Sequence, residues 1–135
     1  MISKSNNVSV TISEEELLAL HQTLLEAKFH AEPDNSDVAG SPIVAGIANR
    51  VYDALVRLEE VRGNASKSEQ WTKWRQVENK KWIVERVRDY AIKNPHWEKW
   101  DNSVRIDYLR CAISPFEIGE DRLHSLLDEI NAAAS

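Results

Sequence analysis

Residues 66–100 read SKSEQWTKWRQVENKKWIVERVRDYAIKNPHWEKW and contain all five tryptophans of the chain, at positions 71, 74, 82, 97 and 100. The same region reverses the charge of the chain. Residues 62–110 carry 12 Lys/Arg against 7 Asp/Glu, whereas residues 1–61 carry 4 against 10 and residues 111–135 carry 1 against 5. An aromatic, basic middle between acidic flanks is the region in which we expect function to lie.

Residues 66–94 are predicted to be helical, because Ser66 and Glu69 have the spacing of a capping box and Pro95 ends the stretch. The two halves place their apolar residues on different faces, with centres about 160° apart when successive residues are projected at 100°. One straight helix cannot bury both faces against a single neighbour. Either the helix breaks around residues 78–81, or it is continuous and each half contacts a different surface.

An earlier helix is predicted from the capping box of Ser13 and Glu16 to about Ala31. Its apolar residues fill an arc of about 200°, wider than a surface helix requires, which predicts a helix central to the core. Within this arc we interpret His21 as a core-edge histidine bonded to a backbone carbonyl. We expect the side chain of Lys28 to extend its amine into water.

The next segment, residues 32–42, reads EPDNSDVAGSP and is a loop by composition. Ser41 is predicted to cap a second helix, with Pro42 at the first helical position, where its missing N–H is not needed. Gly63 offers a left-handed end to this helix. The first two helices therefore form a predicted antiparallel pair.

Two further helices are predicted in the last third of the chain. Asp101 or Ser103 can cap one that runs through Ile113, and the other is regular only from Glu120 because Gly119 weakens its first turn. Val8, Val10 and Ile12 alternate as a short extended lead-in does, and no sheet is predicted. The sequence therefore predicts an all-α fold, a single compact bundle-like domain of five or six helices over residues 1–135, with residues 1–11 as a loose lead-in.

Composition limits the class of protein. Hydrophobic residues make up 42% and charged residues 29% of the chain, and no apolar run is long enough to span a membrane. Residues 1–10 lack the apolar core of a secretory signal. Cys111 is the sole cysteine, which is typical of a reducing compartment. We therefore predict a cytoplasmic protein with no membrane contact.

Catalytic and metal-binding motifs were sought in the same sequence. The four glycines, at 40, 46, 63 and 119, are isolated, which excludes a phosphate-binding glycine loop, and neither G-x-S-x-G nor H-E-x-x-H occurs. Cys111 falls on an apolar helix face, where a packed thiol is expected. Two Glu–His pairs, at 26/30 and 120/124, have the wrong spacing for a metal site in a helical bundle. The sequence predicts no catalytic residue, no metal and no cofactor.

The tryptophan-rich basic segment, residues 66–110, suggests binding. Trp, Tyr and Arg dominate interface hot spots, so we predict a non-catalytic protein-binding module, such as a regulator, inhibitor or immunity-type protein. The predicted binding residues are Trp71, Trp74, Arg75, Trp97, Lys99 and Trp100. The partner is another protein or a second copy, with Trp71 and Trp74 at the interface.

For the tryptophans themselves a structural role is favoured, and other functions rank below protein binding. The same tryptophans suit the core of a small protein as large apolar residues. Tryptophan and arginine together also suit nucleic acid, but the cations of residues 66–94 lie all around the helical projection, interleaved with acidic residues, which is typical of a solvated helix surface. A nucleic-acid-associated protein is therefore the second hypothesis, and an enzyme with an unrecognised site is the third.

Overall fold

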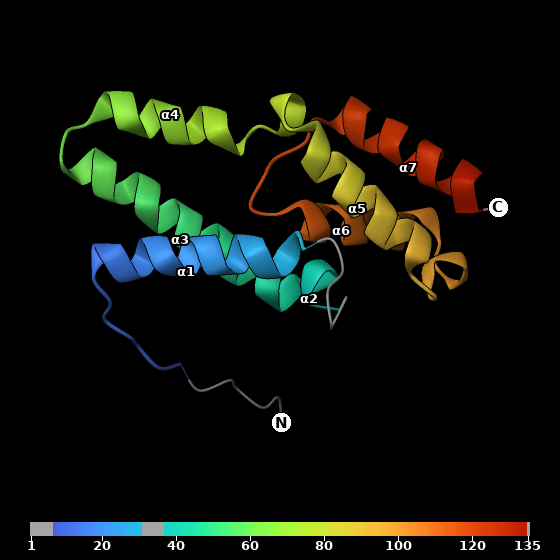
Figure 1. The fold of residues 1–135 in the computed structure, drawn as a ribbon, viewed down its shortest axis with the longest axis horizontal. Coiled ribbons are helices and arrows are strands. Elements are labelled where there is room, and N and C mark those ends of the chain that lie inside the picture. The colour runs from blue at the N-terminus through green and yellow to red at the C-terminus, as the bar shows by residue number, and fades with distance from the viewer. Residues whose placement is uncertain (1–6, 31–36, 135) are drawn as a thin grey trace.

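The computed structural model describes residues 7–30 and 37–134, and it confirms the all-α prediction (Figure 1). Seven α-helices occur in these residues, where the sequence predicted five or six: α1 (Glu14–Lys28), α2 (Asp37–Gly40), α3 (Pro42–Val61), α4 (Ala65–Arg75), α5 (Lys81–Lys93), α6 (Asn102–Ile113) and α7 (Glu120–Ala134). Two 3-10 turns, η1 (Val77–Asn79) and η2 (Trp97–Lys99), flank α5. None of the helices described is both long and apolar enough to cross a membrane.

The helices form two groups that lie side by side in Figure 1. The N-terminal lobe consists of α1, α3 and α4, in which α3 contacts both of the others. The C-terminal lobe consists of α5, α6 and α7, each in contact with the other two. Between the lobes, α2 contacts α1, α3 and α6, so this short helix joins the two groups.

Local capping decides where three helices begin, as the sequence predicted. The Ser13 hydroxyl accepts a hydrogen bond from the Glu16 N–H at 3.1 Å, and the Glu16 carboxylate accepts one from the Ser13 N–H at 2.9 Å. Ser41 and Asp101 cap α3 and α6 through their side-chain oxygens. Gly63, at a φ of 72°, lies in the left-handed region just after α3.

The segment of residues 66–94 breaks, which is the first of the two predicted alternatives. The predicted capping box of Ser66 and Glu69 is wrong, because α4 begins at Ala65. Its cap is Asn64, whose side chain accepts a hydrogen bond from the Lys67 N–H at 3.4 Å. Between α4 and α5 the backbone pairs with a distant segment. The Val77 N–H donates to the Glu117 carbonyl at 3.1 Å, and the Glu117 N–H donates to the Arg75 carbonyl at 2.8 Å. These two bonds replace helical ones and fix the break.

The prediction that the first helix is central to the core is wrong. It ends at Lys28, and its only fully buried residues are His21 and Lys28. Its leucines are half-buried or, like Leu20, 37% exposed. The reason is geometric: the apolar arc of α1 is wider than the surface that α3 can cover, so part of it faces water.

The loop predicted for residues 32–42 is shorter than expected. Residues 31–36 lie outside the described residues, and residues 37–40 form the single turn of α2. This turn lies against α6, and Ala39 at its centre is 1% exposed.

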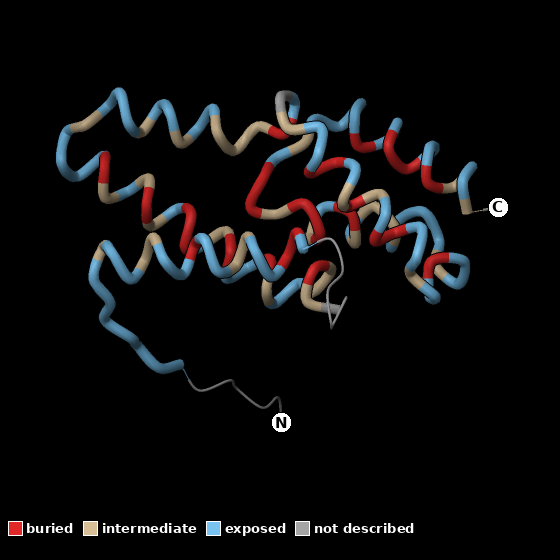
Figure 2. Tube along the Cα trace, viewed as in Figure 1, coloured by how far each residue is buried: buried red, intermediate tan, exposed pale blue. Residues whose placement is uncertain are grey.

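The hydrophobic core lies mainly in the C-terminal lobe (Figure 2). Six of its aliphatic side chains are 0–1% exposed: Ile83, Val87, Leu109, Leu123, Leu126 and Ile130. Phe29, just after α1, and Phe116, just before α7, extend this core toward the N-terminal lobe. The boundary between the lobes is therefore aromatic.

Candidate functional site

Seven aromatic rings make a continuous series of contacts from the N-terminal lobe to the start of α5. We call this series the aromatic row. Its members are His21 of α1, Tyr52 of α3, Trp71 and Trp74 of α4, Phe116 and Phe29 at the boundary, and Trp82 of α5. Neighbouring ring centroids along the row are 4.6 to 6.3 Å apart, the range in which aromatic pairs attract.

At the N-terminal end of the row, His21 is surrounded by other rings. Its centroid lies 5.1 Å from that of Trp74, 5.5 Å from that of Trp71 and 6.3 Å from that of Tyr52. Burial lowers the pKa of His21, so the imidazole is neutral at neutral pH. The backbone carbonyl partner predicted for it stays a prediction.

The middle of the row carries a cation. The Lys80 amine lies 5.5 Å from the ring centroids of both Trp74 and Phe116, and it donates hydrogen bonds to the carbonyls of Trp74 and Gln76. Partial burial lowers the pKa of Lys80. Because this amine is already held by rings and carbonyls of its own chain, it fixes the end of α4.

At the far end of the row the aromatic surface reaches water. Phe29 lies 5.6 Å from Phe116 and 6.3 Å from Trp82, measured between centroids. Phe29 is buried, but Trp82 is 55% exposed. The row therefore begins in a half-buried cluster and ends on a tryptophan that more than half faces solvent.

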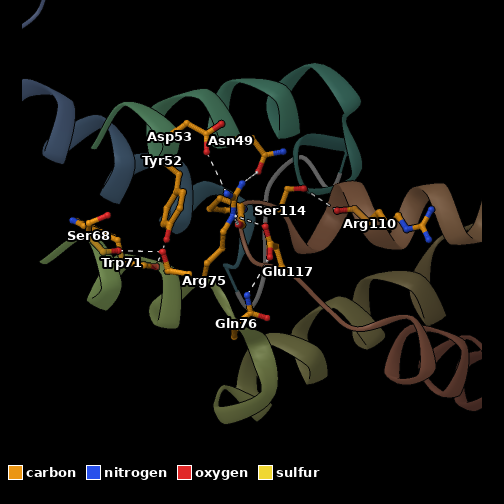
Figure 3. Close-up of polar contacts among 12 residues, drawn as sticks. Asn49, Tyr52, Asp53, Ser68, Trp71, Arg75, Gln76, Arg110, Ser114 and Glu117 are labelled. Carbon is orange, nitrogen blue, oxygen red and sulfur yellow. Dashed lines mark hydrogen bonds and ion pairs between the residues drawn. The ribbon is translucent and has the colours of Figure 1, made fainter. Parts of the chain in front are cut away.

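Arg75 joins three parts of the chain on the other side of α4 (Figure 3). Its guanidinium donates to the Pro115 carbonyl at 2.8 Å, to Asn49 at 3.1 Å and to Asp53 at 3.2 Å, and it lies 3.4 Å from the carboxylate of Glu117. The side chain is 19% exposed. This predicted binding residue is thus engaged inside the molecule.

Tyr52 is the ring against which Arg75 lies, with 4.4 Å between the guanidinium carbon and the ring centroid. Its hydroxyl donates a hydrogen bond to the Trp71 carbonyl, which anchors α4 on α3 (Figure 3). Burial raises the pKa of Tyr52 to about 12, so the phenol stays protonated and remains a donor. Trp71 is consequently held at both its ring and its backbone.

The remaining predicted binding residues lie elsewhere, around η2 at the far end of the C-terminal lobe. Trp97 is 2% exposed, and its indole N–H donates to Asn131 at 3.1 Å. Trp100 is half-buried against Tyr108, with 5.4 Å between centroids, while Lys99 is exposed. The six predicted residues therefore separate into two groups, and Trp97 belongs to the core.

The expectation that the amine of Lys28 extends into water is wrong. Its amine does not reach water: the residue is 0% exposed, and the amine donates to the Ala39 carbonyl at 3.0 Å and the Cys111 carbonyl at 2.8 Å. Burial lowers the pKa of Lys28 to about 8. The side chain of Cys111 is half-buried, and desolvation raises the pKa of its thiol. Through its two hydrogen bonds, Lys28 ties α1 to α2 and α6.

Two residues were absent from the predicted binding set. Trp82 has the same local signal as the other tryptophans, so only the structure distinguishes it. Glu59 is 7% exposed although it is a carboxylate. The burial of Glu59 could have been predicted from the sequence. Ala48, Tyr52 and Leu55 share the buried face of α3, and helical spacing places position 59 on the same face.

The described residues contain no group of three or more His, Cys, Asp or Glu side chains placed to hold a metal ion. In the pair of Glu120 and His124, the two side chains lie 3.7 Å apart on the exposed face of α7. Comparison of the chain with protein families, curated proteins and solved structures finds no match. Inference about function therefore depends on the geometry of the chain itself.

Proposed function

We propose that the protein is a non-catalytic binding module that recognises another protein through the exposed end of the aromatic row. One observation carries this proposal: Trp82 is 55% exposed, yet its ring continues a series of contacts into the interior. A ring fixed in this way offers a large apolar contact with little conformational entropy to lose on binding.

A protein partner fits this surface better than nucleic acid does. The cations nearest the row, Lys80 and Arg75, already bond to carbonyls or carboxylates of the chain. The chain as a whole carries a net charge of −5, which repels a phosphate backbone. Nucleic acid remains the second hypothesis, and the experiment below separates it from the first.

The reactive side chains support binding rather than catalysis. Lys28 has a pKa near 8 but no exposed surface, so a substrate cannot reach its amine. The raised pKa of Cys111 favours the thiol over the nucleophilic thiolate. His21 is neutral and surrounded by rings. An enzyme with an unrecognised site is the third hypothesis.

The test compares Trp82→Ala with Val104→Ala, a control that also removes an exposed apolar side chain, since Val104 is 42% exposed on α6. The parent and both variants are immobilised and incubated with native lysate, with and without nuclease. We expect one protein to be retained by the parent and by Val104→Ala, lost from Trp82→Ala, and unaffected by nuclease.

Two controls make this result decisive. Circular dichroism melting shows whether each variant keeps the parent fold, and sedimentation velocity shows whether the retained partner is a second copy of the chain. Equal retention by the parent and Trp82→Ala would refute the assigned surface. Retention that disappears with nuclease would replace the protein hypothesis with the nucleic-acid one.

A further inference from the structure

An open pocket of about 400 Å³ lies between α1, α3 and α4, at the end where α1 begins and α3 ends. This volume is in the range of small-molecule sites. Leu18, Leu55, Trp71 and Trp74 give it apolar walls, and Glu14 and Glu59 add carboxylates. The pocket is at the opposite end of the aromatic row from Trp82.

Glu59 is the unusual member of this lining. The residue is 7% exposed, and one carboxylate oxygen, Oε2, is buried without a hydrogen-bond partner among the described residues. A buried polar atom without a partner costs free energy, so its presence requires an explanation. Rotation about the last side-chain torsion, which is soft, exchanges the two oxygens. In either arrangement one oxygen of the Glu59 carboxylate is buried without a donor from the described part of the chain.

The nearest cation does not supply the missing bond. The Arg62 guanidinium forms two hydrogen bonds with Glu14, at 2.5 and 2.9 Å, but it lies 3.7 Å from Oε1 of Glu59. That distance is beyond a hydrogen bond. Lys67, at the rim of the pocket, is exposed. Arg62 thus forms an ion pair with Glu59 but hydrogen bonds only with Glu14, and Glu59 is left able to accept a further donor.

The tryptophan rings supply apolar surface for the rest of the ligand. Trp71 and Trp74 both line the pocket, with ring centroids 5.6 Å apart and ring planes at 79°. Tyr52 stacks on Trp74 and the Lys80 amine lies over the Trp74 ring, so the tryptophans contribute apolar area and not a cation site. The carboxylate of Glu59 is therefore the group that selects a positive charge with N–H bonds.

We propose that this pocket binds a small organic cation, a primary ammonium carried on an apolar body. The ammonium donates a hydrogen bond to Glu59, and the apolar body lies against Leu18, Leu55 and the two tryptophans. Glu59 is then the residue that selects charge, and Trp71 and Trp74 select shape. This site is independent of the proposed function, because Trp82 takes no part in it.

The probe is n-hexylammonium, compared with 1-hexanol and with n-hexyltrimethylammonium. Hexanol keeps the apolar chain without the charge, and the trimethyl compound keeps the charge without N–H donors. Each is titrated into the ¹⁵N-labelled protein, and the indole N–H signals are followed by NMR. We expect hexylammonium to shift the signals of Trp71 and Trp74, to leave that of Trp97 unchanged, and to bind at least about tenfold more tightly than either analogue.

The variant that tests the role of the carboxylate is Glu59→Gln, and its matched control is Glu60→Gln. Both remove one negative charge from neighbouring positions of α3, but Glu60 does not line this pocket. We expect Glu59→Gln to weaken hexylammonium binding at least about tenfold and Glu60→Gln to leave it within about twofold.

Three outcomes would overturn the proposal. The first is that hexylammonium shifts no indole signal of the pocket. The second is equal affinity for hexylammonium and hexanol, which would show that the pocket recognises only apolar chains. The third is that Glu59→Gln and Glu60→Gln weaken hexylammonium binding equally, which would show that only the net charge of the protein matters. If Glu59→Gln fails to fold, equal binding of hexylammonium and the trimethyl compound to the parent still refutes the hydrogen bond.

Discussion

The two lobes differ in which side chains they bury and in how completely they bury them. The C-terminal lobe encloses aliphatic side chains that are almost inaccessible, such as Leu126 and Ile130, both 0% exposed. The N-terminal lobe has half-buried leucines, and its helices carry the three polar or charged residues that are buried in the described chain: His21, Glu59 and, at the boundary with α2 and α6, Lys28. Figure 2 shows the difference: buried turns recur along the whole of α7, whereas α1 is mostly exposed or half-buried.

This difference indicates a division of roles. The buried side chains of the C-terminal lobe are mainly aliphatic, although the Nε of Arg86 on α5 is buried without a hydrogen-bond partner among the residues described. Aliphatic burial contributes stability with no desolvation penalty, so this lobe is the expected stable part. Buried titratable groups reduce stability unless their partners are complete, and such groups gather where proteins bind ligands or partners. In the N-terminal lobe, Glu59 lines the open pocket and His21 lies against the tryptophans of α4.

The largest expected effect tests the division directly. Leu126→Ala, in the C-terminal core, should lower the free energy of unfolding by about 2–5 kcal/mol, because it leaves a cavity among fully buried neighbours. Leu24→Ala, on the half-buried face of α1, should lower it by about 1 kcal/mol. Urea denaturation of both variants measures the two values. Equal losses would mean that the lobes contribute alike and that the comparison fails.

The second test uses Lys28, whose folded-state pKa of about 8 lies below its ordinary value of 10.5. Between these values the unfolded chain holds a proton that the folded chain has released, so this group makes stability rise with pH. Relative to Lys28→Met, the parent should gain roughly 3 kcal/mol in free energy of unfolding between neutral pH and about pH 10.5.

Comparison with the variant is needed because other groups act in the opposite direction. The raised pKa values of Cys111 and Tyr52 make stability fall as pH rises past their ordinary values. The Tyr52 contribution is common to both proteins, whereas the Cys111 contribution is larger in Lys28→Met, because the charge of Lys28 lowers the pKa of that thiol. Urea denaturation at a series of pH values, under reducing conditions, gives the difference. A difference that does not change with pH would show that the amine of Lys28 reaches water after all.

How far the sequence predicts this structure depends on how local each decision is. The caps at Ser13 and Ser41 involve residues three positions apart, and the sequence predicted both. It offered Asp101 as one of two caps for α6, and its capping box at Ser66 was wrong, because α4 is capped by Asn64. The break after Arg75 depends on backbone bonds to Glu117, so the sequence left two alternatives open. Local pattern alone could not choose between them.

The candidate site follows the same rule. Whether the amine of Lys28 reaches water depends on the carbonyls of Ala39 and Cys111, which the fold brings together from distant positions. Trp97 and Trp82 look alike in the sequence, yet one is 2% and the other 55% exposed. Such differences arise from the contacts of each ring with other helices, which the periodicity of a single helix does not contain.

The smallest expected effect concerns the connection between the lobes, at Gly40 on α2. A Cβ atom there would lie 2.3 Å from Cε1 of Tyr108 on α6, far inside van der Waals contact. The Tyr108 ring cannot move away freely, because it contacts the rings of Trp97 and Trp100. Gly40→Ala should therefore lower the free energy of unfolding by about 1–3 kcal/mol, as overpacking does.

Gly46→Ala is the matched control for this substitution. Gly46 lies within α3, and a Cβ atom added there meets no other atom within 4 Å. Because alanine favours the helix over glycine, this variant should gain about 0.5–1 kcal/mol. Thermal melting compares both variants, and the ¹⁵N NMR signal of the Trp100 indole reports whether Tyr108 has shifted. If both variants gained stability, α2 would not be seated against α6, and the two lobes would be joined more loosely than the contacts of Gly40 require.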